Sequence, residues 1–303
     1  MDNSDSCYDK TTGYFYVIRP AFKEYFFGKK KKEGEKNVDN SNHTMFNRPE
    51  LCGNENMIPY IYHRFKNGDP ICLDWHLLSS NQHPTAIQLL KENIDKVNWT
   101  LLSANSCREA FEFLKTRPEK IDWIFLSSNS YWEAVELLEK NVDKICWPQL
   151  CRNTNPRALQ LLEQNIDRID WYILSGNHTR EAVELVSSHT ARLDSWIALS
   201  GNPWATTLLE QNIDKICWKT LSSNSHPRAI QFLLDNPEKI DYDYLSSNTH
   251  PTAIRILEQN IDKINWFHLS SNPTALSAGL LENYEDDLDL SSFLFNTSLC
   301  SKF

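Results

Sequence analysis

Histidines that share one position in a repeated phrase are the first residues to consider for metal binding. His83, His226 and His250 each come directly before a proline, and His178 lies close to the same position. Imidazole nitrogens bind zinc, copper and iron, so stacked histidines would suit a metal site. However, His83 is far from the others along the chain, and no cysteine or carboxylate recurs with them. We therefore expect these histidines to shape or cap a loop, and the sequence predicts no metal and no cofactor.

Short motifs that mark catalytic sites are absent from the chain. It contains no G-x-x-x-x-G-K, G-x-G-x-x-G, H-E-x-x-H or G-x-S-x-G, which are the patterns of phosphate loops, dinucleotide sites, zinc proteases and nucleophile elbows. Its 8 glycines are too few for a scaffold that cradles phosphates. We expect no enzymatic activity and assign no catalytic residue.

Better candidates for function are positions that vary inside an otherwise regular repeat. The two positions after each repeat tryptophan carry aromatic residues and charges of both signs, and aromatic side chains are common anchors of protein interfaces. The candidate partner-binding residues are His76, Thr100, Ile124, Phe125, Tyr172, Lys219, Asp243, Tyr244, Phe267 and His268. The alternative is that these positions tolerate change and have drifted without a function.

The repeat that positions these residues is about 24 residues long. A tryptophan or its substitute is followed by leucine or phenylalanine three residues later and by asparagine six residues later. The repeat positions are Trp75, Trp99, Trp123, Trp147, Trp171, Trp196, Trp218, Tyr242, Trp266 and Leu290. Repeats of this length indicate an array in which each unit packs on its neighbours, and such arrays are typical of binding surfaces.

Each unit reads as two helices. After Pro84, the apolar residues recur on one face as far as Asn93, which predicts a helix. We expect asparagine to end it by adopting the left-handed conformation that helix ends favour. Aspartate or asparagine before the tryptophan, as in Asp74 and Asn98, predicts the start of a second, shorter helix.

We therefore predict an all-α fold, an α-solenoid of about nine to ten two-helix repeats with degenerate capping units. Residues 1–50 would be a non-repetitive N-terminal segment, and residues 51–303 the solenoid. Within the solenoid, 51–74 is the N-terminal cap, with Leu51 aligned 24 residues before Trp75. Residues 75–289 hold nine clear repeats, and 290–303 form the C-terminal cap. In the first segment, Tyr14–Phe27 suggests a strand and a short helix. Gly28–His43, which contains the basic run Lys29–Lys32, suggests a flexible linker.

Other recurring residues have structural interpretations. Asp-Lys pairs before the tryptophan, such as Asp143-Lys144, suit a solvated edge of little energetic weight. The asparagine column suits capping and loop hydrogen bonds. Two tryptophans, Trp132 and Trp204, lie off the main column, where both interface anchoring and core packing remain open.

Charge and cysteine content limit the expected partners and the expected cellular location. The net charge of −9 falls on residues 59–303, since residues 1–58 hold equal numbers of acidic and basic residues. An acidic array repels phosphate backbones, so nucleic acid is an unlikely partner. The 8 cysteines show no C-x-x-C spacing, and no apolar run approaches 18 residues. We expect reduced thiols, an intracellular location and no membrane span.

The consensus L-S-x-N-P-x-A-I-x-L-L-E-x-N-x-D-K-I-x-W resembles a family of short helical repeat proteins abundant in giant DNA viruses. Leu199–Ala205 shows its compact first half and Ala253–Trp266 its second half. The resemblance implies a scaffold or adaptor that binds a host or viral protein in the host cytoplasm along an extended surface. Its alternative is a structural component of the virion, such as a minor capsid or internal protein. The sequence leaves the oligomeric state open.

Overall fold

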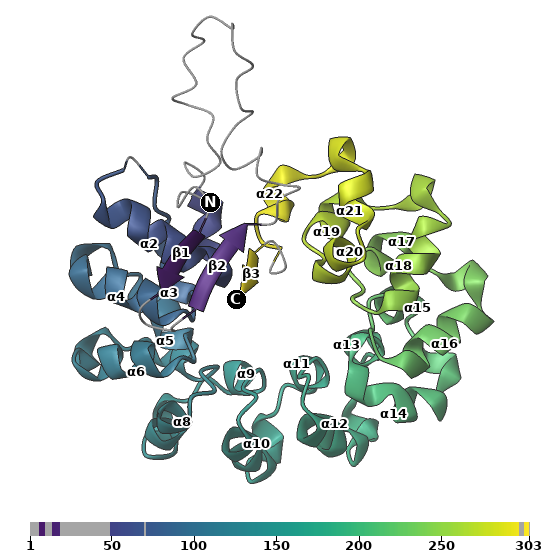
Figure 1. The fold of residues 1–303 in the computed structure, drawn as a ribbon. Coiled ribbons are helices and arrows are strands. Elements are labelled where there is room, and N and C mark those ends of the chain that lie inside the picture. Colours follow the sequence, from purple (N-terminus) through teal and green to yellow (C-terminus); the bar gives the residue numbers. More distant parts are fainter. Residues whose placement is uncertain (1–5, 10–13, 19–48, 70, 297–299, 303) are drawn as a thin grey trace, which may run out of the picture.

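The computed structural model describes residues 6–9, 14–18, 49–69, 71–296 and 300–302. Within these ranges the repeat region is helical, which confirms the predicted all-α class for it (Figure 1). The predicted linker Gly28–His43, its run Lys29–Lys32 and the expected helix after Ile18 lie outside the described residues.

A repeat unit consists of a short α-helix, a longer α-helix and one turn of 3-10 helix. The short helices are α3 (Trp75–Ser80), α5 (Trp99–Ala104), α7 (Trp123–Leu126), α9 (Trp147–Leu150), α11 (Trp171–Ser175), α13 (Ile197–Gly201), α15 (Trp218–Leu221), α17 (Tyr242–Leu245), α19 (Trp266–Ser270) and α22 (Leu290–Phe293). The longer helices are α2 (Ile58–Lys66), α4 (Pro84–Glu92), α6 (Arg108–Lys115), α8 (Trp132–Glu139), α10 (Pro156–Glu163), α12 (Arg180–Ser187), α14 (Thr206–Glu210), α16 (Pro227–Asp235) and α18 (Pro251–Glu258), followed by the pair α20 (Pro273–Ser277) and α21 (Leu280–Asn283).

The 3-10 turns, which the sequence did not predict, contain the Asp-Lys pairs or their equivalents. They are η7 (Ile94–Lys96), η8 (Pro118–Lys120), η9 (Val142–Lys144), η10 (Ile166–Arg168), η11 (Thr190–Arg192), η13 (Ile213–Lys215), η14 (Pro237–Lys239), η15 (Ile261–Lys263) and η16 (Glu285–Asp287). Three further turns, η5 (Pro49–Gly53), η6 (Glu55–Met57) and η12 (Pro203–Ala205), stand at helix starts or in the first unit.

The N-terminal caps of the helices agree with the sequence prediction, whereas the conformation at their C-terminal ends differs from it. Asp74 caps α3 by accepting hydrogen bonds from the backbone N–H groups of His76 and Leu77, as predicted. Asn93 does end α4, but its φ is −131°, so the expected left-handed conformation is wrong. Its side-chain amide instead donates to the carbonyl of Leu89 at 2.9 Å. The side chain, rather than a reversal of the backbone, satisfies a carbonyl that the helix end leaves open.

Units stack on their neighbours in chain order. The short helix α3 contacts α5, and α5 contacts α7; the longer helices α4 and α6 pack together in the same way. Each unit buries the leucine three residues after the tryptophan, such as Leu126, and an alanine of the longer helix, such as Ala134, both fully buried. A single apolar core therefore runs from unit to unit along the stack.

The asparagine column forms a hydrogen-bond ladder between units. Asn153 is fully buried, and its side-chain amide donates to the backbone carbonyls of Ser127 at 3.0 Å and Asn129 at 2.8 Å, both in the preceding unit. Its side-chain oxygen accepts from the N–H of Asn155 in its own loop. The same pair of bonds to a preceding unit recurs at Asn105, Asn129, Asn177, Asn202, Asn224, Asn248, Asn272 and Asn296. Asn81 donates to the carbonyl of Cys52 in the first unit. The structural interpretation of this column is confirmed, and it connects units as well as shaping loops.

The Asp-Lys pairs have a role that the sequence interpretation missed. The Lys144 ammonium lies 4.3 Å from the ring centroid of Trp123, and Lys239 lies at the same distance from Trp218. Each cation thus covers the half-buried tryptophan at the start of its own unit. Such cation–π contacts contribute about 0.5–1 kcal/mol at exposed sites, so this edge is not merely solvated.

The stack curves until its ends meet, and it forms a ring (Figure 1). The side-chain amide of Asn54 donates to the backbone carbonyls of Leu294 at 3.0 Å and Asn296 at 3.1 Å. These are the ladder bonds, made here between the first and last units. A Cβ on Gly53 would lie 2.6 Å from a ring carbon of Phe295, so glycine permits the close approach. The two units predicted as caps therefore contact each other, and each end covers the core of the other.

Ring closure also reveals the register of the first unit. Cys52 accepts from the N–H of Asp74 and Asn54 continues the ladder, so Leu51 corresponds to Leu78. The alignment of Leu51 with Trp75 is thus shifted by three residues. The difference arises because 27 residues, rather than 24, separate Asn54 from Asn81.

A small sheet lies beside this junction. β1 (Ser6–Asp9) pairs antiparallel with β2 (Tyr14–Ile18), which confirms the strand expected there, and β2 pairs antiparallel with β3 (Cys300–Lys302). The sheet order is β1-β2-β3, and β1 contacts α2. Backbone from both ends of the chain is thereby joined next to the ring junction. Among the described residues, no helix is long and apolar enough to cross a membrane.

Candidate interaction surface

The candidate residues lie on the short helices, which line the inner side of the ring, while the longer helices lie outside (Figure 1). The third residue after each tryptophan packs into the core. At 100° per residue, the position directly after the tryptophan points about 200° away from it. This geometry directs the first variable position away from the core in successive units. We call the residues at that position, His76, Thr100, Ile124, Pro148, Tyr172, Ile197, Lys219, Asp243 and Phe267, the inner strip.

Exposure separates the two variable positions. In the inner strip Ile124, Tyr172 and Phe267 are 54%, 56% and 54% exposed. His76, Lys219 and Asp243 are also exposed, and Thr100 is half-buried. At the second position Phe125 is half-buried, whereas Tyr244 and His268 are exposed. The structure thus brings the first position together as an accessible column, and most second positions lie between neighbouring helices.

Polar members of this surface contact the adjacent unit. The His76 ring nitrogen Nδ1 lies 2.7 Å from the Asn98 amide, and the Thr100 hydroxyl donates to Asp122 at 3.2 Å. The Lys219 ammonium lies 5.1 Å from the Tyr244 ring centroid. These contacts hold polar side chains between large apolar ones that face solvent. Ile197, 47% exposed, belongs with the apolar set, and the regular repeat spacing could have placed it there.

The histidines before proline are helix caps. The Nδ1 atoms of His83, His226 and His250 each accept from the backbone N–H two residues later, at 3.1–3.2 Å. An unprotonated nitrogen at this position satisfies an N–H group at a helix start. The predicted capping role is confirmed.

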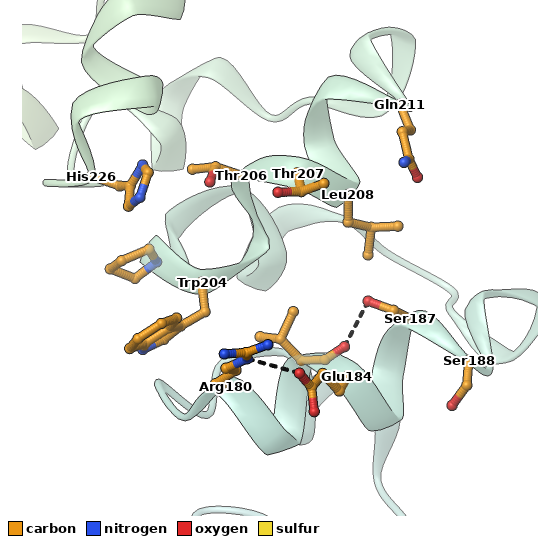
Figure 2. Close-up of a pocket in the computed structure, with 12 residues that line it drawn as sticks. Arg180, Glu184, Ser187, Ser188, Trp204, Thr206, Thr207, Leu208, Gln211 and His226 are labelled. Carbon is orange, nitrogen blue, oxygen red and sulfur yellow. Dashed lines mark hydrogen bonds and ion pairs between the residues drawn. The ribbon is translucent and has the colours of Figure 1, made fainter.

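A second feature lies on the outside of the ring. Between α12 and α14 is a cavity of about 770 Å³, lined by Val183, Trp204 and Leu208 among others (Figure 2). An adjoining cavity of about 410 Å³ lies between α10 and α12 and shares Glu184 and Ser188 with the first. The unit from Trp196 to Trp218 lacks the two-residue loop, and its outer helix α14 has only five residues. The 3-10 turn η12 runs directly into α14, and Trp204 in that turn is 55% exposed.

Trp132, at the start of α8, is 52% exposed. Of the two interpretations left open for the off-column tryptophans, core packing is therefore wrong for both. The sequence signal for this outer site was the shortened unit, which indicated a loop deletion but not a cavity.

Buried cysteines supply a chemical test of the fold. Cys52 and Cys151 occupy the serine position of the repeat, and burial raises the pKa of each thiol to about 11. Because the thiolate is the reactive form, both should remain neutral and unreactive at pH 8. We expect alkylation followed by peptide mapping to label exposed Cys72 within minutes and to label Cys52 and Cys151 only in denaturant. Equal labelling of the three in the native protein would contradict the buried positions.

The chain matches no known protein family, and comparison with curated proteins and with solved structures finds no significant similarity. The geometry therefore supplies the functional argument.

Proposed function

We propose that this chain is a closed α-solenoid that serves as a protein-binding scaffold and holds its partner by the inner strip. The observation that carries the proposal is the set of large apolar side chains exposed there. Ile124, Tyr172, Ile197 and Phe267 are each about half exposed on equivalent positions of short helices. Aromatic side chains of this kind supply much of the binding energy in protein interfaces.

The arrangement favours binding over drift for a physical reason. Exposed sites that tolerate change in an acidic chain have no reason to retain large apolar side chains, because these expose hydrophobic surface to water. The ladder asparagines and buried leucines hold the backbone of each short helix against its neighbour. A partner would therefore meet a preorganised surface and lose little free energy to ordering it.

The test is recovery of partners by affinity purification of the tagged protein after nuclease treatment, followed by mass spectrometry. In the triple variant Tyr172→Ala, Ile197→Ala and Phe267→Ala, we expect recovery to fall about tenfold or more, since hot-spot side chains contribute 2 kcal/mol or more each. The melting temperature should change little, because all three side chains are exposed.

The matched control replaces exposed apolar residues of the 3-10 turns, Ile94, Val142 and Ile213, by alanine. This variant should retain its partners. Equal recovery from both triple variants would refute the inner strip as the binding surface. Recovery of only the structural proteins of a particle, unaffected by either set of changes, would move the role to particle structure.

A further inference from the structure

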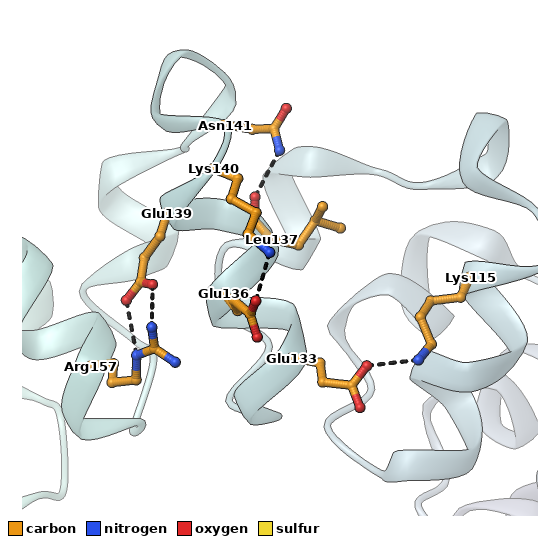
Figure 3. A network of polar contacts seen from close by, with 8 residues as sticks. All are labelled: Lys115, Glu133, Glu136, Leu137, Glu139, Lys140, Asn141 and Arg157. Atoms are coloured by element: carbon orange, nitrogen blue, oxygen red, sulfur yellow. Dashed lines mark hydrogen bonds and ion pairs between the residues drawn. The ribbon is translucent and has the colours of Figure 1, made fainter.

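Ion pairs join the longer helices of neighbouring units on the outside of the ring. Glu139 at the end of α8 pairs with Arg157 of α10 through two bonds of 2.5 and 3.1 Å (Figure 3). Lys115 pairs with Glu133 at 2.7 Å, and Glu210 pairs with Arg228. The partners in each pair are 18 residues apart. One position near the helix end and one near the next helix start therefore form an ion-pair slot in these three places.

The slot between α10 and α12 holds two acids instead. Glu163 and Glu181 are separated by the same 18 residues, both are exposed, and both line the 410 Å³ cavity. Across the described part of the chain, neither glutamate has an ion-pair partner. The nearby cations are committed elsewhere: Arg180 pairs with Glu184 at 2.8 Å and Arg192 with Asp167 at 3.3 Å. His189 stacks on Trp171, with ring centroids 5.1 Å apart.

The next slot along the ring holds no charged side chain. Its two positions are Ser187 and Trp204, which line the 770 Å³ cavity. The two cavities share residues and together form one outer groove across α10, α12 and α14. The groove contains three glutamates, Glu163, Glu181 and Glu184, and one arginine, Arg180. It is therefore acidic at one end, and the exposed indole of Trp204 lies at the other end.

We propose that this outer groove binds an extended protein segment that carries an arginine and, three residues later, a large apolar side chain. The guanidinium would lie between Glu163 and Glu181, where its planar fork can donate to both carboxylates. It would supply the positive charge that Arg157 supplies one unit earlier. The apolar side chain would pack on Trp204 and Leu208.

The spacing of the two side chains follows from the stacking of the helices. Adjacent packed helices lie about 10 Å apart, and an extended peptide advances about 3.3 Å per residue. Neighbouring slots are therefore about three residues apart for a segment that crosses the helices. This groove is separate from the inner strip, and its test does not involve the strip, so either can fail alone.

The experiment measures fluorescence anisotropy of a labelled eight-residue peptide with arginine and leucine three positions apart and only serine and glycine elsewhere. We expect saturable binding by the full chain that weakens as salt is added, since exposed charge pairs are screened. Peptides with glutamate in place of arginine, or with arginine and leucine adjacent, should bind at least about tenfold more weakly, because hydrogen bonds to charged groups contribute about 1.5–3 kcal/mol.

The decisive variant is Glu181→Arg. It would give the slot the same ion pair as Glu139 and Arg157, so it should abolish peptide binding while the melting temperature stays equal or rises. Trp204→Ala should also weaken binding about tenfold. The matched controls are Glu258→Gln, at the same helix position in another unit, and Trp132→Ala, the other exposed outer tryptophan; both should bind normally.

The proposal is overturned if no peptide binds, or if Glu181→Arg binds as the unchanged protein does. It is also overturned if light scattering shows a dimer that Trp204→Ala dissociates, since the groove would then be occupied by a second copy of the chain.

Discussion

Replacing Asn153 by alanine is expected to lower the free energy of unfolding by about 4 kcal/mol, because each buried polar group left without its partner costs about 1–3 kcal/mol. The fully buried side chain donates to the carbonyls of Ser127 and Asn129 and accepts from the N–H of Asn155. The substitution removes three hydrogen bonds and breaks the ladder between two units. Urea denaturation followed by tryptophan fluorescence measures the loss.

Asn165→Ala provides the matched control. That asparagine is half-buried and donates only to the carbonyl of Leu161 in its own helix, at 2.8 Å. Its loss should lower stability by about 1 kcal/mol, as for a single hydrogen bond. Equal losses in the two variants would mean that the ladder adds nothing between units beyond local capping.

Ring opening is the second large effect. In the double variant Asn54→Ala and Phe295→Ala, the junction loses the bonds to Leu294 and Asn296 and the packing of Phe295 over Gly53. We expect amide hydrogen exchange to rise roughly a hundredfold at both 51–61 and 290–296, since two lost hydrogen bonds favour local opening. Residues 123–200 should exchange as before. Small-angle X-ray scattering should show a larger maximum dimension.

The junction is the place where we expect the ring to open. Neighbouring units elsewhere are joined directly by the chain, whereas the first and last units of the ring are not. Leu294 also takes the place of the ladder serine, such as Ser270, whose hydroxyl accepts an N–H from the next unit. Asn93→Ala, which removes a bond within one helix, should leave the exchange of both ends unchanged. Faster exchange at one end alone would indicate fraying rather than opening.

Closure of the ring changes the surface that the protein presents to a partner. An open stack offers one long edge and two terminal units whose outer faces must be made polar. Here Leu51 and Phe293 at the two ends are buried, and the ends contact each other. The inner strip therefore follows the inside of a ring, and the acidic outer groove lies on the opposite side of the same units.

Much of each unit followed from the sequence because it depends on local contacts. The period placed the short helices, Asp74 and its equivalents capped them, and Asn93 and its equivalents ended the longer ones. The candidate residues at the first variable position also lie on one accessible column, since helix geometry alone directs them. The Phe125 side chain is less exposed to solvent because the second variable position turns toward the neighbouring unit.

Other features of the fold depend on contacts between side chains and groups about one repeat length away in the sequence. The second donor bond of Asn153, to the carbonyl of Asn129, joins residues 24 positions apart in neighbouring units. The cation–π contact of Lys144 with Trp123 joins residues 21 positions apart at the two ends of one unit. A repeat pattern shows that such residues recur but not which neighbour they contact. The same limit concealed the outer groove, because its lining comes from the helices of successive units.

The repeat, its two helices and the separation of buried from variable positions could all be read from the amino-acid sequence, since periodicity and capping act within a few residues. Closure of the stack into a ring is visible only in the folded chain. Closure depends on the rotation from each unit to the next, a small angle set by packing and summed over the whole ring. Because no single unit encodes that sum, the bonds from Asn54 to Leu294 and Asn296 appear only when all units are assembled.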